Sequence, residues 1–219
     1  MATKRVGGST IVYSTPPVIV SAATVAGPKE SEGQMAQCFD ELVPDDMFGE
    51  RTPEKAERRF MEDAIKIALG SARVLPEQVN MIFAGDLLNQ IITSSFTAEG
   101  FGIPFVGLYG ACSTMAQSLT MASAMVDGGY ADLALAVTSS HYQTAERQFR
   151  YPIELNIMRK STSQYTVTGA GAALVGRSGG KVKVTEATIG KVIDMGIKDP
   201  NQMGPAMPHA AADTTYADL

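Results

Sequence analysis

Residues 104–137, PFVGLYGACSTMAQSLTMASAMVDGGYADLALAV, place a long run of small and apolar residues between two short strand-like segments. The segments 104–109 and 131–137 each predict a buried strand. The run 113–127 predicts a helix that the following glycine pair ends, and its near absence of charge is typical of a buried helix. A strand, a helix and a second strand in this order favour a parallel βαβ unit.

The same alternation extends towards the N-terminus. Apolar, β-branched segments predict buried strands at 18–25 and 79–86. Between them, a threonine N-cap followed by proline and an acidic residue predicts an amphipathic helix over 53–69, with a glycine directly after it as the stop. A weaker helical pattern covers 89–97.

Two further strands are predicted near the C-terminus, at 165–175 and 181–193, joined by a tight Ser-Gly-Gly turn and forming an antiparallel edge. The predicted fold class is therefore α/β. Its elements follow a βαβαβαββ order, with a mixed five-stranded sheet, helices on both faces, and a buried helix that carries Cys112 at its start.

One domain is expected to span residues 1–193, followed over 194–219 by a linker and the start of another helix. Within the domain, residues 27–50 predict a loop with one helical turn, and residues 138–164 predict a long polar excursion.

Composition narrows the class of protein. The chain is 45% hydrophobic and 19% charged with a net charge of −5, which is typical of a globular protein and argues against a nucleic-acid partner. The spacing of Cys38 and Cys112 suggests no disulfide framework, which favours a reducing compartment. The two cysteines and the two histidines are also too scattered to match the spacing of a zinc-type metal site. We expect a soluble, cytoplasmic protein without a signal peptide, because no apolar run approaches the ~20 residues of a membrane span.

Cys112 is the first candidate site residue. It follows a predicted strand and precedes the apolar helix, which places it at the carboxyl edge of a parallel sheet, where such folds bind ligands. The free N–H groups and the dipole at the start of a helix favour an anion, either the thiolate itself or a ligand carboxylate. The alternative is a cysteine that packs as a small hydrophobic residue.

Polar residues follow two other predicted strands at the same edge. Asp86 ends one strand and can orient a ligand, although a loop cap is the more common role of such an aspartate. Ser139, Ser140 and His141 follow another strand and can donate to a carboxylate, or form an ordinary polar turn.

Other residues carry two interpretations each. Arg147 and Arg150 can bind a carboxylate in a bidentate manner, but an ion pair with Glu146 or Glu154, or contact with a dimer mate, is favoured. Phe149 and Tyr151 can stack on a planar ring or pack in a core or an interface. The glycines of 169–171 lie in a strand pattern, so close packing of the backbone against the central helix is favoured over a phosphate loop.

Two long segments connect these features to a known fold. The strand–Cys–helix segment, followed by ADLALAVTSS (131–140) and TVTGAGAALVGRS (166–178), resembles the N-terminal half of the thiolase-like superfamily, and its β-ketoacyl synthase III branch in particular. This resemblance implies that Cys112 stands at the position of the nucleophile. It also implies that residues 194–219 are a linker and the start of the second repeat of that fold, and that the part of this repeat that supplies the catalytic His and Asn lies outside these residues; His209 matches no such motif.

A closer resemblance covers essentially the whole chain. The segments STPPVIVSAATVAGPKESEG (14–33), GLYGACST (107–114) and SSHYQTAERQFRYP (139–152) are similar to those of the stage V sporulation protein AD family. The resemblance implies a non-catalytic protein that binds dipicolinic acid, pyridine-2,6-dicarboxylate, with calcium present only as a chelate of that ligand. It further implies a homodimer that works with other proteins of the SpoVA membrane channel, in the forespore and peripheral to the spore inner membrane.

For the ligand, these considerations name Cys112, Asp86, Ser139, Ser140 and His141 as binding residues, with no cofactor and no metal site. The alternative is an acyltransferase of the β-ketoacyl synthase III type, in which Cys112 is the nucleophile.

Overall fold

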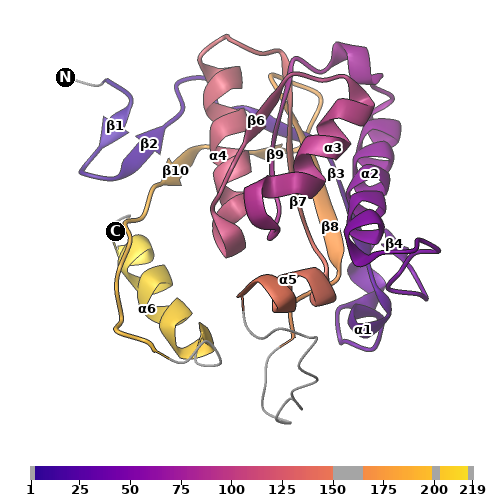
Figure 1. Cartoon of the computed structure of the whole chain (residues 1–219). Helices are drawn as coiled ribbons and strands as arrows, with labels where there is room; N and C mark the ends of the chain where they lie inside the picture. Colours follow the sequence, from indigo (N-terminus) through magenta and orange to yellow (C-terminus); the bar gives the residue numbers. More distant parts are fainter. Residues whose placement is uncertain (1–2, 150–164, 199–202, 217–219) are drawn as a thin grey trace.

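The computed structural model describes residues 3–149, 165–198 and 203–216 (Figure 1). The strands are β1 (Arg5–Val6), β2 (Thr10–Val12), β3 (Val18–Ala26), β4 (Glu41–Leu42), β5 (Met81–Gly85), β6 (Phe105–Gly107), β7 (Leu133–Ser140), β8 (Gly169–Gly176), β9 (Val182–Lys183) and β10 (Glu186–Thr188). The helices are α1 (Pro28–Ser31), α2 (Pro53–Ala72), α3 (Ile92–Phe101), α4 (Thr114–Asp127), α5 (Tyr142–Phe149) and α6 (Met203–Tyr216).

A mixed sheet organises the fold, in the order β4-β3-β8-β7-β5-β6, with β9 also pairing with β3. β5 is parallel to both β6 and β7, whereas β8 is antiparallel to both β3 and β7. The predicted α/β class is confirmed, and five of the six predicted strands are present in this sheet, as β3, β5, β6, β7 and β8. The two-residue strands β4 and β9 enlarge the sheet beyond the predicted five.

The prediction that β8 forms an edge is wrong, because β8 lies at the centre of the sheet between β3 and β7. Its sequence, GAGAALVG, suits this position, since small residues let the neighbouring backbones approach. A Cβ atom on Gly169 would lie only 2.5 Å from the carbonyl oxygen of Val25 on β3. Gly169 is closely packed, but against strand β3, so the prediction that it packs against the central helix is wrong.

The predicted hairpin after β8 is also absent. β9 pairs with β3 and not with β8, and β10 joins β1 and β2 in a separate three-stranded sheet. The connection crosses the backbone of β3 so closely that a Cβ atom on Gly180 would lie 2.0 Å from the carbonyl oxygen of Ile19. The segment predicted as one strand over 181–193 is therefore two short strands in different sheets.

α2 and α4 cover opposite faces of the sheet (Figure 1). α2 begins as predicted, with Thr52 as N-cap accepting a hydrogen bond from the Lys55 N–H. It continues two residues past the expected stop at Gly70 and ends where Arg73 takes a left-handed conformation (φ 55°). The apolar face of α2 contributes Phe60, Ala64, Ile65, Ala68 and Leu69 to the larger of two buried clusters.

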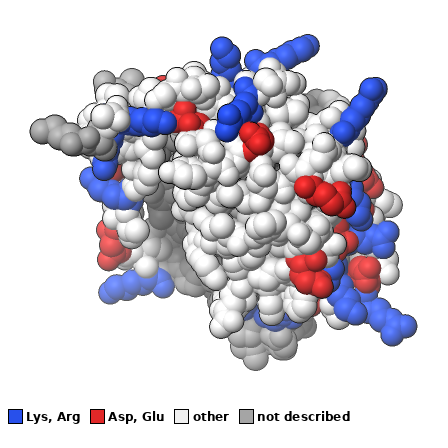
Figure 2. Space-filling view, turned by 90° about the horizontal axis from the view of Figure 1, so that it is seen from above, with Lys and Arg blue, Asp and Glu red and all other residues white. Residues whose placement is uncertain are grey.

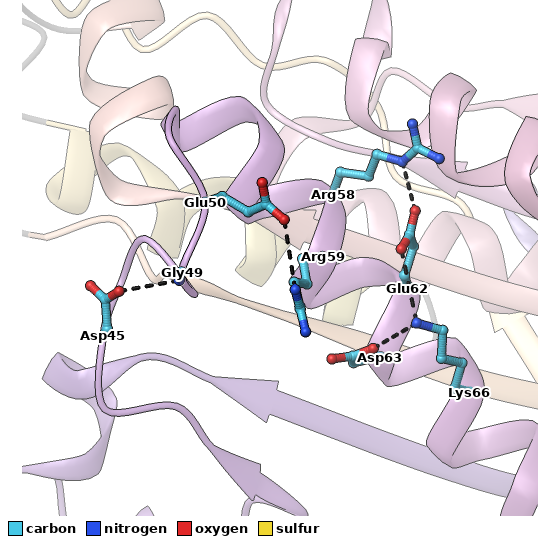
Figure 3. A network of polar contacts seen from close by, with 8 residues as sticks. All are labelled: Asp45, Gly49, Glu50, Arg58, Arg59, Glu62, Asp63 and Lys66. Carbon is cyan, nitrogen blue, oxygen red and sulfur yellow. Dashed lines mark hydrogen bonds and ion pairs between the residues drawn. The ribbon is translucent and has the colours of Figure 1, made fainter.

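The outer face of α2 is charged, as its amphipathic pattern predicts. Figure 3 shows Arg58 paired with Glu62, Lys66 bridging Glu62 and Asp63, and Arg59 paired with Glu50 in the loop before the helix. These ion pairs are partly exposed, so each contributes at most about 1 kcal/mol to stability.

α4 forms the second cluster with the opposite face of the sheet, where Ala122 and Val126 pack near Phe83, Ala134 and Ala136. Burial of this helix is one-sided. Its residues Ser118, Ala122 and Val126 face the sheet and are buried, whereas Ala116 and Gln117 are exposed.

The predicted polar excursion contains a helix that the sequence pattern did not indicate. α5 directly follows β7, while residues 150–164 lie outside the described part of the chain. The expected helix near the C-terminus is present as α6. On the surface, Figure 2 shows basic and acidic side chains intermixed around the face seen from above, with uncharged surface between them.

Within residues 3–149, 165–198 and 203–216, no helix combines the length and apolar character that crossing a membrane requires.

Candidate functional site

A cavity of about 710 Å³ lies at the carboxyl end of β7 and beside the start of α4. It is lined by residues of β3, β7 and β8, by the turn that carries Cys112, and by the segment 165–167. Five further segments complete the lining with Phe39, Leu87, Met115, Ala145 and Met207. None of the described residues that line it is charged, so the cavity presents apolar groups, hydroxyls and backbone to a ligand.

Cys112 lies in a 3-10 turn, Ala111–Ser113, immediately before α4, and it is exposed at the cavity. This confirms its predicted place between a strand and a helix, and its exposure argues against a packing role. Ala111 has a φ of 48°, a left-handed conformation that costs a non-glycine residue about 1–2 kcal/mol. The turn is thus held in a strained conformation that presents the thiol.

The turn is pressed against the end of β5. A Cβ atom on Gly85 would lie 2.2 Å from the carbonyl oxygen of Leu108 and 2.9 Å from Cγ2 of Thr114. Only glycine leaves room for this approach, which sets the start of α4 beside the carboxyl ends of the parallel strands.

Alternation along β7 separates the predicted serines. β7 extends to Ser140, so Ser139 and Ser140 belong to the strand and not to the turn after it. Leu135 and Val137 pack in the cluster on the α2 face, and Ser139 continues that register. Ser139 contributes to the lining of the cavity, but its hydroxyl donates to the buried carboxyl of Glu57 on α2, at 3.0 Å.

Thr138 and Ser140 have the opposite register and share the α4 face with the cavity. The Ser140 hydroxyl donates to the carbonyl oxygen of Val167 at 2.6 Å, and the Thr138 hydroxyl donates to that of Gly85 at 3.1 Å. Their hydrogens are therefore engaged, while their oxygens can still accept a hydrogen bond.

Asp86 is 5% exposed and lies outside the cavity lining, although its neighbour Leu87 belongs to it. Its carboxylate accepts hydrogen bonds from the Leu88 N–H at 2.9 Å and from both the N–H and the hydroxyl of Ser94 at 2.7 Å. This is the loop-cap geometry that was the favoured interpretation, and it fixes the connection between β5 and α3.

His141 is completely buried and also lies outside the lining. Its Nδ1 accepts a hydrogen bond from the Gln143 N–H, which leaves the ring proton on Nε2, 2.9 Å from the carbonyl oxygen of Asp46. Burial lowers the pKa of His141, so the ring is neutral in this environment. The imidazole thus holds the start of α5 to the loop before α2.

Glu57 is a buried acidic residue that the sequence pattern did not single out. It lies on the apolar face of α2, is completely buried, and accepts hydrogen bonds from Ser139 and Thr144. Burial, followed by the nearby charge of Asp86, raises its pKa to about 8, although these two hydrogen bonds oppose the rise. The sequence did contain a signal for Glu57. It is a glutamate on the helix face whose other residues are apolar and recur at helical spacing.

The remaining candidates lie apart from the cavity or outside the described residues. Arg147 forms an ion pair with Glu54, which agrees with the favoured kind of role but involves a different glutamate from those expected. Arg150 and Tyr151, and the side chain of Phe149, lie outside the described part of the structure. Cys38 and His209 are exposed and do not line the cavity.

Gly171 corrects another prediction. Close packing was expected there, but a Cβ atom on Gly171 would meet nothing within 4 Å, and the residue lines the cavity. The absence of a side chain therefore leaves open space for a ligand.

Comparison with known proteins identifies the family. The family model of stage V sporulation protein AD matches residues 7–219. Stage V sporulation protein AD of Bacillus subtilis (strain 168) is 46% identical over 211 residues, which are 96% of this chain and 62% of that protein. The chain thus spans less than two thirds of the length of this relative.

Solved structures of condensing enzymes are similar in fold. A cerulenin-bound OleA variant of Xanthomonas campestris aligns with a TM-score of 0.62 and 13% identity, over 94% of this chain and 70% of that chain. The 3-oxoacyl-[acyl-carrier-protein] synthase III of Aquifex aeolicus aligns with a TM-score of 0.52 and 19% identity, over 74% of this chain and 54% of that chain. The predicted thiolase-like fold is confirmed, and the chain belongs to the stage V sporulation protein AD family.

Proposed function

We propose that this chain is a non-catalytic sporulation protein that binds dipicolinic acid, pyridine-2,6-dicarboxylate, for its uptake into the forespore. The observation that carries the proposal is the cavity of about 710 Å³ that opens on the Cys112 turn and has no charge among the described residues that line it. Its volume lies in the range that small-molecule sites have, about 300–1,000 Å³.

The chemistry of the lining suits a planar aromatic acid. Gly171 leaves open space for the ring, and Phe39 and Tyr165 offer aromatic contacts. One carboxylate would lie at the start of α4 beside Cys112, where the helix dipole favours an anion. Because the described lining residues carry no charge, a calcium chelate is a second form in which the ligand would enter.

The other predicted site residues would act from the edges of the cavity. Ser139 and Ser140 form part of its lining, with Ser140 on the same face as Cys112. Asp86 and His141 would hold two segments of the cavity wall in place. Asp86 fixes the loop that carries Leu87, and His141 fixes the turn after Ser140.

Calorimetry with dipicolinate on the full-length protein tests the proposal. Gly171→Leu should abolish the heat of binding, because its side chain would fill the open space in the cavity. Gly70→Leu is the matched control: it also meets nothing within 4 Å, but it lies on the exposed end of α2. No heat from a folded wild-type protein, or equal heats from both variants, would contradict the proposal.

An acyltransferase is the second candidate, and the exposed thiol of Cys112 on its strained turn favours it. In this alternative the thiolate attacks the thioester carbonyl of an acyl-CoA, forming an acyl-enzyme and releasing CoA as its thiolate, which takes a proton from water. Mass spectrometry of the protein incubated with acyl-CoA would detect the adduct, and Cys112→Ser is its control. Dipicolinate binding without any adduct would support the first function over the second.

The proposed function also carries proposed partners. The protein would act with other proteins of the SpoVA membrane channel, peripheral to the spore inner membrane, and as a homodimer. Co-purification of tagged protein from sporulating cells, with and without detergent extraction of the membrane, tests the first of these associations.

A further inference from the structure

Two tyrosine rings lie against each other at the edge of the cavity. The ring centroids of Tyr142, the first residue of α5, and Tyr165 are 5.2 Å apart, and the ring planes make an angle of 29°. This geometry is close to the offset stacking that aromatic pairs prefer. Tyr165 lines the cavity and Tyr142 does not, so Tyr142 supports the Tyr165 ring from outside the lining.

The backbone that carries Tyr165 is fixed to the same part of the fold. The carbonyl oxygen of Val167 accepts a hydrogen bond from the Ser140 hydroxyl at 2.6 Å, at the end of β7. One residue later, the hydroxyl oxygen of Thr168 accepts from the Tyr142 N–H at 3.0 Å. The backbone segments that carry the two rings are therefore joined beside the stack, which limits how far the rings can move apart.

The Tyr165 ring is fixed but still accessible. Tyr165 is 56% exposed although Tyr142 covers part of it, so ring surface remains open to a ligand. Phe39 is the other aromatic side chain among the described residues of the lining, and within that part of the chain no second ring is stacked on it. Tyr165 is thus the better-supported aromatic surface of the cavity.

Stacking would distinguish ligands that charge cannot. Because no charged side chain occurs among the described lining residues, ion pairing offers little selectivity between two acids of equal charge. A planar aromatic ring can continue the stack of Tyr142 and Tyr165, whereas a puckered saturated ring cannot.

We propose that Tyr165 is the specificity-determining residue of the cavity, on which the ring of a planar aromatic acid stacks. Tyr142 is a positioning residue that holds the Tyr165 ring in place. The identity of the ligand as dipicolinate rests on the proposed function, whereas the preference for a planar ring rests on the tyrosine pair.

Two dicarboxylates of equal charge measure this preference. Isophthalate has a planar ring, and cis-cyclohexane-1,3-dicarboxylate carries its carboxylates at the same ring positions on a puckered one. In calorimetry on the full-length wild-type protein, isophthalate should bind roughly tenfold more tightly than its saturated counterpart. Tyr165→Leu should lose most of this preference and weaken dipicolinate binding roughly tenfold. Tyr165→Phe keeps the ring and should keep both affinities within about twofold.

The ratio of the two affinities separates positioning by Tyr142 from a structural role. Tyr142→Leu should lower the planar preference roughly threefold, and Tyr142→Phe should retain it. If Tyr142→Leu weakens both ligands equally, its role is structural and the positioning role is wrong. Tyr130→Leu is the matched control, since Tyr130 is 76% exposed and outside the lining, and it should leave both affinities unchanged.

The remaining outcomes decide between this proposal and the proposed function. A planar preference that Tyr165→Leu removes, without dipicolinate binding to the wild-type protein, would support the stacking role and contradict the proposed function. Equal dipicolinate affinities of the wild-type protein and Tyr165→Leu would do the reverse, as would a planar preference lost in Phe39→Leu and kept in Tyr165→Leu. Failure of the folded wild-type protein to bind any of the three ligands would overturn both.

Discussion

Ser139 lines the cavity, yet its hydroxyl donates to Glu57, 3.0 Å away and on the α2 side of the sheet. Successive side chains of a strand point to opposite faces of the sheet. Ser139 therefore points to the α2 side, whereas Thr138 and Ser140 point to the other side. Ser139→Ala should therefore act first on stability. It would leave Oε1 of Glu57 without a described partner and should lower the free energy of unfolding by about 1–3 kcal/mol. Urea denaturation measures this, with Ser140→Ala, at a half-buried position, as the comparison; an equal or larger loss for Ser140→Ala would contradict the assignment.

The pH dependence of stability follows from Glu57. Its pKa in the folded protein is about 8, against an ordinary value of 4.5. Between these values the folded protein holds a proton that the unfolded chain releases, so the contribution of Glu57 to the free energy of unfolding falls as the pH rises towards about 8.

Glu57→Gln removes this titration. The stability of the variant relative to wild type should increase with pH and reach roughly 2 kcal/mol in its favour near pH 9. Urea denaturation of both proteins at several pH values measures the difference. A difference that stays constant from about pH 5 to about pH 9 would show that Glu57 has an ordinary pKa.

The crossing of β3 by the connection after β8 makes Gly180 a sensitive position. A Cβ atom there would lie 2.0 Å from a backbone oxygen that cannot easily move. Gly180→Ala should lower the free energy of unfolding by about 2 kcal/mol or more. Gly171→Ala introduces the same methyl group into open space and should change stability by less than about 1 kcal/mol. Equal thermal shifts in the two variants would argue against the crossing.

Homodimerisation is a further prediction, and the edge formed by β6 and α3 is where we expect it. β6 is the last strand of the sheet, and Ile92, Phe96 and Val106 expose apolar side chains along this edge. Unpaired strand edges with exposed apolar residues favour association. Phe96→Asp should shift the sedimentation coefficient of the full-length protein towards that of a monomer. Leu75→Asp, at an exposed apolar residue outside this edge, should leave it unchanged.

Much of the architecture could be predicted because its signals are local. The β-branched run at β3, the N-cap of α2 and the apolar segment around α4 each determine an element through contacts within a few residues. Cys112 was placed correctly for the same reason, since a strand and a helix adjoin it on either side. The location of β8 could not be predicted, because which strands pair depends on contacts between residues far apart in the chain.

The sequence by itself determined the α/β class, the order of the long strands and helices, and the position of Cys112 before α4. These depend on periodicity and on turn residues, which act within one or two turns of chain. Only the tertiary structure decided which polar groups meet. Glu57, Ser139 and Thr144 come from three elements and are joined by hydrogen bonds only because α2, β7 and α5 pack together, while Asp86 and His141 are bonded outside the cavity lining. Buried polar groups must find partners wherever the packed elements bring them, and that requirement is satisfied in three dimensions.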